Sequence, residues 1–235
     1  MAFHQPHYPG AEQARNLILP FPYFIYRGKK VRAENGRVRG LLLSTDKLAI
    51  DISLGGALPV SSEDNRLRER MPDLDPILEI GPSLKWHFSE RLNVELPLRW
   101  ANSIDGTNID ERGWISTPQL RYVREGEATR LQMTLGAVYA SRQLQNYFYA
   151  VDPEYVTGDR PRYLADPGLM AYRATINYQK RFGNTIIGAY AAYYDLSDAE
   201  NLASPLLAEK SQFSVGLRIA WILRTAKKRV NVKQR

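Results

Sequence analysis

Seven basic side chains occupy alternate positions of segments whose intervening residues are largely apolar, and together they could bind an anion. They are Lys85, Arg99, Arg121, Arg130, Arg173, Arg181 and Arg218. Acidic residues at equivalent positions are fewer, and include Asp51, Glu79 and Glu95. If these charges line an enclosed space, they predict a basic channel or pocket that tolerates anions. The alternative, which we favour, is that acids and bases pair across a narrow interior and largely fill it.

Catalytic chemistry has little support in the sequence. His87 and Ser89 lie two residues apart beside Glu90, and could act as base and nucleophile of a lipid-modifying hydrolase. Ser89-Glu90 is, however, typical of a tight turn, which would take Ser89 off the face that carries His87. We therefore keep a hydrolase only as a remote alternative, and predict no catalytic residues and no enzymatic activity.

Metal and cofactor sites are not expected either. His4 and His7 have no other histidine nearby, so they do not suggest a metal site. The chain contains no cysteine, which excludes disulfides and thiolate ligands. It also lacks a glycine-rich phosphate-binding loop and a dinucleotide fingerprint, so we predict no cofactor.

The charged side chains must be held by strands, and the segment 170–182 shows the required pattern most clearly. Its even positions are apolar except for Lys180, and its odd positions are mostly polar. Successive side chains of a strand point to opposite faces, so one face is apolar and the other polar. A soluble sheet would bury the apolar face, whereas a membrane barrel would turn it towards lipid. The length of 13 residues favours the membrane, because a tilted spanning strand needs about 9–11 residues and strands of soluble proteins have about 5–6.

Similar segments recur, and the connections between them alternate in length. We expect strands at 17–27, 29–44, 47–57, 77–88, 91–101, 113–124, 128–141, 170–182, 185–195 and 211–223. The facing of 185–195 stays open. We expect short turns near residues 45, 89, 126 and 183, and long loops at 58–76, 102–112, 142–169 and 196–210. Short turns on one rim and long loops on the other are typical of outer-membrane barrels. The sequence thus predicts an all-β fold, a closed antiparallel transmembrane barrel of about 10 strands. The number becomes about 12 if Asn35-Gly36 forms a hairpin turn and the N-terminal segment pairs.

Aromatic residues follow the same pattern. Trp86, Trp100, Trp114 and Trp221 fall near strand ends on the apolar side, as in the aromatic girdles of membrane barrels. The long loops carry further aromatics, namely Tyr147, Phe148, Tyr149, Tyr155 and Tyr163. These either bind partners or fold over the mouth of the barrel, and the sequence leaves both alternatives open.

Composition bounds the remaining possibilities. No apolar run reaches the roughly 18 residues of a membrane-spanning helix. The net charge is +7, but the tail 224–235 carries six basic residues and no acid, so we expect no nucleic-acid partner. We expect one barrel domain over 1–223, with an N-terminal segment at 1–16, followed by the basic tail. The first residues show neither the basic start nor the apolar stretch of a signal peptide, and we interpret the sequence as a mature form with an added start.

Several short segments resemble the MipA/OmpV family of Gram-negative outer-membrane proteins. They are His7 to Glu12, Leu19 to Gly28, Met71-Pro72-Asp73-Leu74, Glu79-Ile80-Gly81-Pro82, Tyr147-Phe148-Tyr149, Ser204-Pro205-Leu206-Leu207 and Gly216 to Trp221. Their order and spacing, across residues 7 to 223, carry the resemblance. The missing signal peptide and the basic tail depart from the family pattern.

This resemblance implies an outer-membrane β-barrel with lipid around it. The namesake of the family is an adaptor between a lytic transglycosylase and a peptidoglycan synthase, and other members are described as porin-like or adhesive. We therefore expect a scaffold or adaptor for peptidoglycan-synthesising and -cleaving machinery at the cell envelope. The alternative is a small-solute porin with a basic lumen. The oligomeric state stays open.

Overall fold

The computed structural model has an all-β architecture with a single α-helix among the residues that it describes, which are 1–18, 20, 26–27, 31–34, 37–45 and 47–222. The first strands are β1 (Ala2–Pro6), β2 (Ala14–Ile18), β3 (Tyr26–Arg27), β4 (Val31–Glu34), β5 (Arg37–Ser44), β6 (Leu48–Ala57) and β7 (Ile77–His87). The later strands are β8 (Leu92–Asp105), β9 (Asn108–Ser116), β10 (Gln119–Glu125), β11 (Thr129–Ala140), β12 (Gly168–Phe182), β13 (Thr185–Asp195) and β14 (Ser211–Trp221). The helices are η1 (Arg66–Arg68), α1 (Arg142–Tyr149) and η2 (Pro153–Tyr155).

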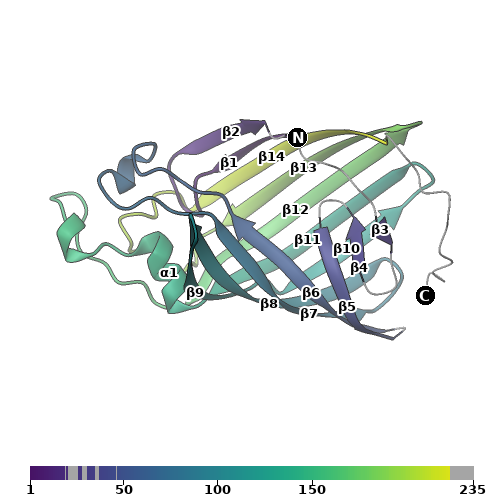
Figure 1. The fold of residues 1–235 in the computed structure, drawn as a ribbon, viewed down its shortest axis with the longest axis horizontal. Helices are drawn as coiled ribbons and strands as arrows, with labels where there is room; N and C mark the ends of the chain where they lie inside the picture. Colours follow the sequence, from purple (N-terminus) through teal and green to yellow (C-terminus); the bar gives the residue numbers. More distant parts are fainter. Residues whose placement is uncertain (19, 21–25, 28–30, 35–36, 46, 223–235) are drawn as a thin grey trace.

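The strands form one curved antiparallel sheet, which wraps into a barrel-like wall (Figure 1). Neighbours follow the order β2-β1-β14-β13-β12-β11-β10-β8-β7-β6-β5-β4-β3. Strands β9 and β10 follow each other along the chain, and both lie between β8 and β11. The predicted all-β, barrel-like fold is confirmed.

The distribution of side chains across this wall is the reverse of that in a soluble protein. Tyr172, Ile176 and Tyr178 of β12 have exposed fractions of 44%, 43% and 45%. Polar residues such as Ser83 and Glu95 are buried instead. The predicted facing, with apolar side chains outward and charged side chains inward, is therefore confirmed.

The strand β13, whose facing the sequence left open, points Ile186, Gly188 and Ala192 inward, where they are buried. Ile187 is exposed on the outer face. Apolar residues thus stand on both faces of β13, which explains why its alternation of polar and apolar residues could not be recognised.

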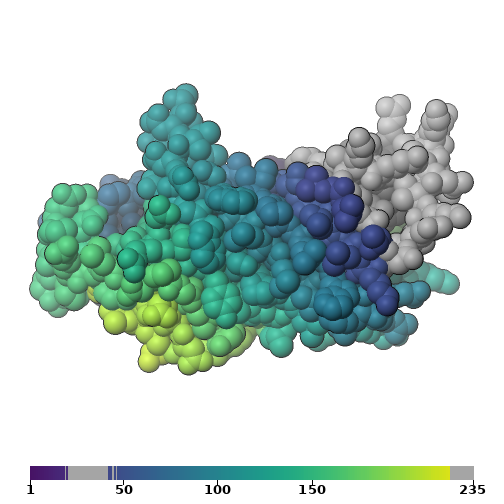
Figure 2. Space-filling model, turned by 90° about the horizontal axis from the view of Figure 1, so that it is seen from below, coloured from purple at the N-terminus to yellow at the C-terminus, as the bar shows by residue number. Residues whose placement is uncertain are grey.

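Short turns lie at one end of the strands and long connections at the other, as predicted, except at one predicted loop. Figure 1 shows α1 and the connections 58–76, 141–167 and 196–210 gathered at one end. We call this end the loop rim and the other the turn rim. The predicted loop at 102–112 is wrong, because β8 and β9 continue there as a hairpin that pairs Asp105 with Asn108. Gly106 turns the chain with φ of +56°, and the teal hairpin stands out from the surface in Figure 2.

The hairpin was missed because it rises beyond the neighbouring strands. Residues 108–111 are exposed, with no apolar face to bury, so their sequence is mostly polar and shows no alternation.

The predicted loop 142–169 contains a helix, α1, which the sequence pattern did not predict. Ser141 caps this helix by accepting a hydrogen bond from the backbone amide of Leu144.

The N-terminal segment adds to the sheet. Strand β1 pairs with β14 and with β2, so half of the polar stretch 1–16 lies in strands. Strands β4 and β5 form a hairpin that pairs Glu34 with Arg37, which settles the alternative at the predicted turn. The dipeptide Asn35-Gly36 itself, most of the predicted strand 17–27 and the basic tail 224–235 lie outside the described residues.

A compact apolar core lies at the loop rim rather than inside the wall of strands. It joins Tyr8, Val60, Leu74, Leu144, Phe148, Tyr149, Met170, Leu196 and Leu207. Its members come from the N-terminal turn, the long connections, α1 and the adjoining ends of strands such as β12. Across the described residues, no helix combines the length and apolarity needed to cross a bilayer.

Candidate functional site

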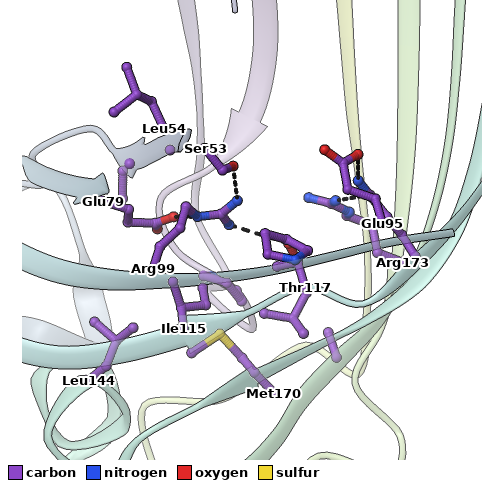
Figure 3. A pocket seen from close by; sticks show the side chains of 18 of the residues that line it. Ser53, Leu54, Glu79, Glu95, Arg99, Ile115, Thr117, Leu144, Met170 and Arg173 are labelled. Atoms are coloured by element: carbon purple, nitrogen blue, oxygen red, sulfur yellow. Dashed lines mark hydrogen bonds and ion pairs between the residues drawn. The ribbon is translucent and has the colours of Figure 1, made fainter. Parts of the chain in front are cut away.

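The predicted basic residue Arg99 of β8 forms a buried ion pair inside the wall (Figure 3). Its Nε lies 2.9 Å from Oε2 of Glu79 on β7. Its two Nη atoms donate to the hydroxyls of Ser53, at 3.2 Å, and Thr117, at 3.4 Å. Gly55 leaves the room for this pair, because a Cβ there would overlap the carboxylate of Glu79.

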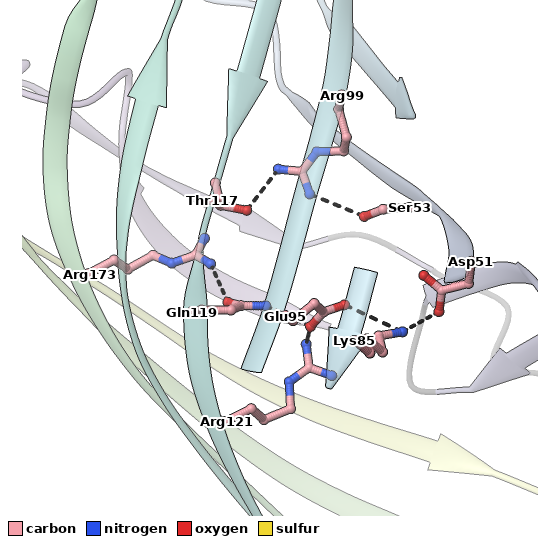
Figure 4. Close-up of polar contacts among 9 residues, drawn as sticks. All are labelled: Asp51, Ser53, Lys85, Glu95, Arg99, Thr117, Gln119, Arg121 and Arg173. Carbon is pink, nitrogen blue, oxygen red and sulfur yellow. Dashed lines mark hydrogen bonds and ion pairs between the residues drawn. The ribbon is translucent and has the colours of Figure 1, made fainter. Parts of the chain in front are cut away.

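A second ionic cluster surrounds Glu95 (Figure 4). The Lys85 ammonium pairs with Asp51 of β6 and lies 3.5 Å from Oε1 of Glu95. Arg121 of β10 pairs with Oε2 of the same carboxylate. The charged side chains of these pairs are at most 6% exposed, so the attraction acts where little water screens it.

Gln119 extends this cluster to β12. Its Nε2 donates to Oε2 of Glu95 at 2.8 Å, and its Oε1 accepts from Nη2 of Arg173 at 3.1 Å. Four predicted residues, Lys85, Arg99, Arg121 and Arg173, thus lie together in the interior. Three of them pair with carboxylates of neighbouring strands, along the wall rather than across the interior, whereas Arg173 contacts an amide.

The other three predicted residues lie elsewhere. Arg130 pairs with Glu125 at 3.0 Å, and Arg181 is exposed and donates to the carbonyl of Gly183. Both line a separate cavity of about 220 Å³ at the turn rim. Arg218 donates to Oε1 of Gln179 at 2.6 Å. The seven residues therefore do not form one site.

The loop rim is closed by a cap in which the N-terminal turn is tied to the long connections. The Tyr149 hydroxyl donates to the carbonyl of Pro9 at 2.8 Å. Gln212 of β14 accepts from the amide of Gly10 at 2.8 Å and donates to the carbonyl of Ala11 at 2.7 Å. Burial raises the pKa of Tyr8 to about 12, so its hydroxyl stays protonated within the cap.

Arg68 fastens the connection 58–76 to α1. It is buried, and its Nη1 donates to the carbonyl of Phe148 at 3.1 Å, while its Nη2 donates to that of Pro72 at 3.2 Å. Burial also lowers the pKa of Arg68 from its ordinary value. Since a guanidinium presents several donors in a fixed plane, one side chain holds two backbone segments together.

A cavity of about 290 Å³ lies between the cap and the ionic clusters. Figure 3 shows Ile115, Leu144 and Met170 on one side of it, and Arg99 and Arg173 on the other. The cavity therefore has one apolar wall and one charged wall.

Comparison with known proteins identifies the family. The family described as MltA-interacting protein MipA matches residues 1–223. The chain belongs to the MipA family. Searches of curated proteins and of solved structures gave no match.

Four of the seven segments that carried the resemblance to the MipA family meet in the cap. Tyr8, Leu74, Phe148, Tyr149 and Leu207 all belong to the apolar core at the loop rim. These short motifs lie far apart in the sequence, and their shared feature is that they pack against one another.

Several residues of this MipA-family chain that build the cap were not predicted. Arg68, Asn65 and Gln212 are buried and hydrogen-bonded there. The loop 58–76 is charged and without periodicity, so nothing in its sequence marked Arg68 as buried. Asn65 could have been recognised from the sequence as a helix cap, because its side chain caps η1 and asparagine is common at that position.

Among the described residues, those of the hydrolase alternative do not form a base–nucleophile pair. Ser89 lies in the turn after β7, and its hydroxyl accepts from the backbone amides of Arg91, at 3.3 Å, and Leu92, at 3.1 Å. Within the described part of the chain, no hydrogen bond joins His87 to Ser89. His4 and His7 also have different partners, since the His4 ring is hydrogen-bonded to Asn16 and the His7 ring to Asn65.

Proposed function

We propose that this MipA-family chain is a non-enzymatic outer-membrane β-barrel that acts as a scaffold or adaptor for peptidoglycan-synthesising and -cleaving machinery. The family name describes its namesake as interacting with MltA, a lytic transglycosylase. An enzyme of this class is therefore the expected partner at the periplasmic face. A peptidoglycan synthase is the second.

The outer surface supports insertion in a lipid bilayer. Exposed leucine, isoleucine and valine side chains cover the outside of the strands, a surface that water does not favour. Trp86 and Phe88 stack with ring centroids 5.3 Å apart near the turn rim, and Trp221 ends β14 at the same rim. Trp100 and Trp114 pair across β8 and β9 nearer the loop rim. Such rings suit the two levels of lipid headgroups.

The observation that favours a scaffold over a pore is the cap at the loop rim, above an inner face whose charges are largely paired. The charges of Lys85, Arg99 and Arg121 are paired with carboxylates on neighbouring strands of this face, and the apolar core of the cap lies at the loop rim. An open channel would need a continuous wet path past both obstacles. The basic-lumen porin remains the second candidate, because the cavity beneath the cap shows that the lumen is not solid.

Planar-bilayer recording separates the two candidates. The purified chain is expected to give no stable conductance steps, whereas frequent open, anion-preferring steps would favour the porin. Arg99→Ala breaks one interior ion pair, and conductance steps that appear only in this variant would show that this pair helps to close the lumen.

The adaptor role is tested by capture of a lytic transglycosylase on the immobilised chain. A partner in the periplasm is expected at the turn rim, where Glu90 and Glu127 are exposed. The double variant Glu90→Lys, Glu127→Lys should weaken capture. Its matched control is Asp159→Lys, an exposed charge reversal at the loop rim, which should leave capture unchanged. Equal capture by all three proteins and by a bead without protein would remove the adaptor role.

A further inference from the structure

The interior cavity beneath the cap has two chemically distinct walls. Leu144 and Phe148 of α1, with Met170 of β12, supply apolar surface. Arg99, Gln119 and Arg173 lie on the polar wall, from three different strands. Small-molecule sites commonly combine a mainly apolar lining with a few placed polar groups, so the lining resembles that of a binding site.

The charge balance of the polar wall selects the sign of a ligand. Its three carboxylates, Asp51, Glu79 and Glu95, already pair with Lys85, Arg99 and Arg121. A cationic ligand would have to displace one of these internal partners. The wall therefore offers no ready place for a positive charge.

Arg173 is the cation of this wall with donors to spare. Its hydrogen bond goes to the neutral Oε1 of Gln119, and among the described residues no carboxylate pairs with it. A guanidinium carries five N–H donors, of which this bond uses one. Gln119 is itself held by Glu95, so the Arg173 head is oriented by a fixed neighbour rather than neutralised.

We propose that this cavity binds a small amphipathic anion, a carboxylate on a short apolar body, with Arg173 as its recognition residue. The planar guanidinium pairs with both oxygens of a carboxylate, and the apolar body packs against Leu144, Phe148 and Met170. The volume of about 290 Å³ lies near the lower end of the range for small-molecule sites, about 300–1,000 Å³.

The site is independent of the adaptor role. The proposed ligand lies under the cap, whereas a peptidoglycan enzyme would meet the turn rim. Loss of one activity would therefore leave the other measurable.

Equilibrium binding to the full chain in lipid nanodiscs tests the site, with empty nanodiscs as the blank. The probes are 3-phenylpropionate and its uncharged amide, 3-phenylpropanamide, which have nearly the same shape. The acid is expected to bind at least about tenfold more tightly than the amide, because the carboxylate accepts two charge-assisted hydrogen bonds from the guanidinium, whereas the neutral amide offers one oxygen. Equal affinity for the two probes overturns the proposal.

Variants at two arginines locate the effect. Arg173→Gln should abolish the preference for the acid without leaving a carboxylate unpaired, and Arg173→Lys should reduce it several-fold by removing the planar fork. The matched control is Arg130→Gln, which removes a positive charge from the other cavity and should keep the full preference. An equal loss in Arg130→Gln, or full preference in Arg173→Lys, also overturns the proposal.

Discussion

The hydroxyl of Tyr8 donates a hydrogen bond of 2.9 Å to the backbone carbonyl of Leu206, 198 positions further along the chain. The two ends of the barrel sequence thereby meet in the cap. Because Tyr8 is buried, the carbonyl of Leu206 has no obvious route to water if this bond is lost.

We predict that Tyr8→Phe destabilises the protein by about 1–3 kcal/mol, the range for a buried polar group left without its partner. The measurement is the free energy of unfolding in detergent, followed by the loss of the folded electrophoretic form. Tyr172→Phe is the control, since that ring lies on the outer surface, and its effect should be small. Equal effects for both variants would mean that the bond to Leu206 contributes nothing.

Gly10 is expected to tolerate no side chain. Its φ is +87°, and a Cβ would lie 2.6 Å from Cγ of Leu207. Gly10→Ala should therefore cost about 1–3 kcal/mol through backbone strain, and should increase cleavage of the cap by a soluble protease. Gly158→Ala, whose Cβ would meet nothing within 4 Å, is the matched control. Identical cleavage rates would contradict this prediction.

His7 should make the cap sensitive to mild acid. Burial, followed by the nearby charge of Arg15, lowers the pKa of His7 from its ordinary value of 6.5. The unfolded segment therefore binds a proton more readily than the folded one. The stabilisation is complete above about pH 6.5 and is lost as the pH falls through the folded pKa.

The measurement is protease sensitivity of the cap between pH 7.5 and pH 5. Cleavage should rise with acidity in the native chain and rise less in His7→Gln, which cannot take up a proton. Asp73 acts in a lower pH range, because the backbone and side-chain hydrogen bonds of Ser62 lower the pKa of its carboxyl. A pH profile shared by the native chain and His7→Gln would exclude His7 as the cause.

How far the sequence predicts this fold depends on whether a segment buries or presents an apolar face and is bounded by recognisable turns. The strand at 185–195 was predicted with the bounds that the structure shows, and 170–182 lies within β12 (Gly168–Phe182). In both, a run of alternating or β-branched residues is bounded by a clear turn. The β8–β9 hairpin was not predicted, because its residues 108–111 are all exposed and alternation therefore had no cause there.

The interior charges could be predicted in part from the sequence, whereas the cap could not. The alternation placed Lys85, Arg121 and Arg173 on the inner face, but it could not say which carboxylate each would meet, since register is set by pairing between distant strands. The cap has no periodicity at all. Arg68 is buried there because backbone carbonyls from two segments converge on it, an arrangement that only the folded chain creates.

The Lys85 ammonium should be the most sensitive point of the interior. It stands between Asp51 and Glu95, and replacing it by methionine leaves two buried carboxylates without this shared cation. We predict that Lys85→Met destabilises the barrel by about 3–5 kcal/mol, as for other buried pairs broken from one side. The double variant Lys85→Met, Asp51→Leu should recover much of this loss, because it removes one uncompensated charge. Thermal unfolding in the same detergent measures both, with Arg130→Gln as a control for loss of a half-exposed ion pair at the turn rim. If the double variant were no more stable than Lys85→Met, the pairing with Asp51 would not be the source of the stabilisation.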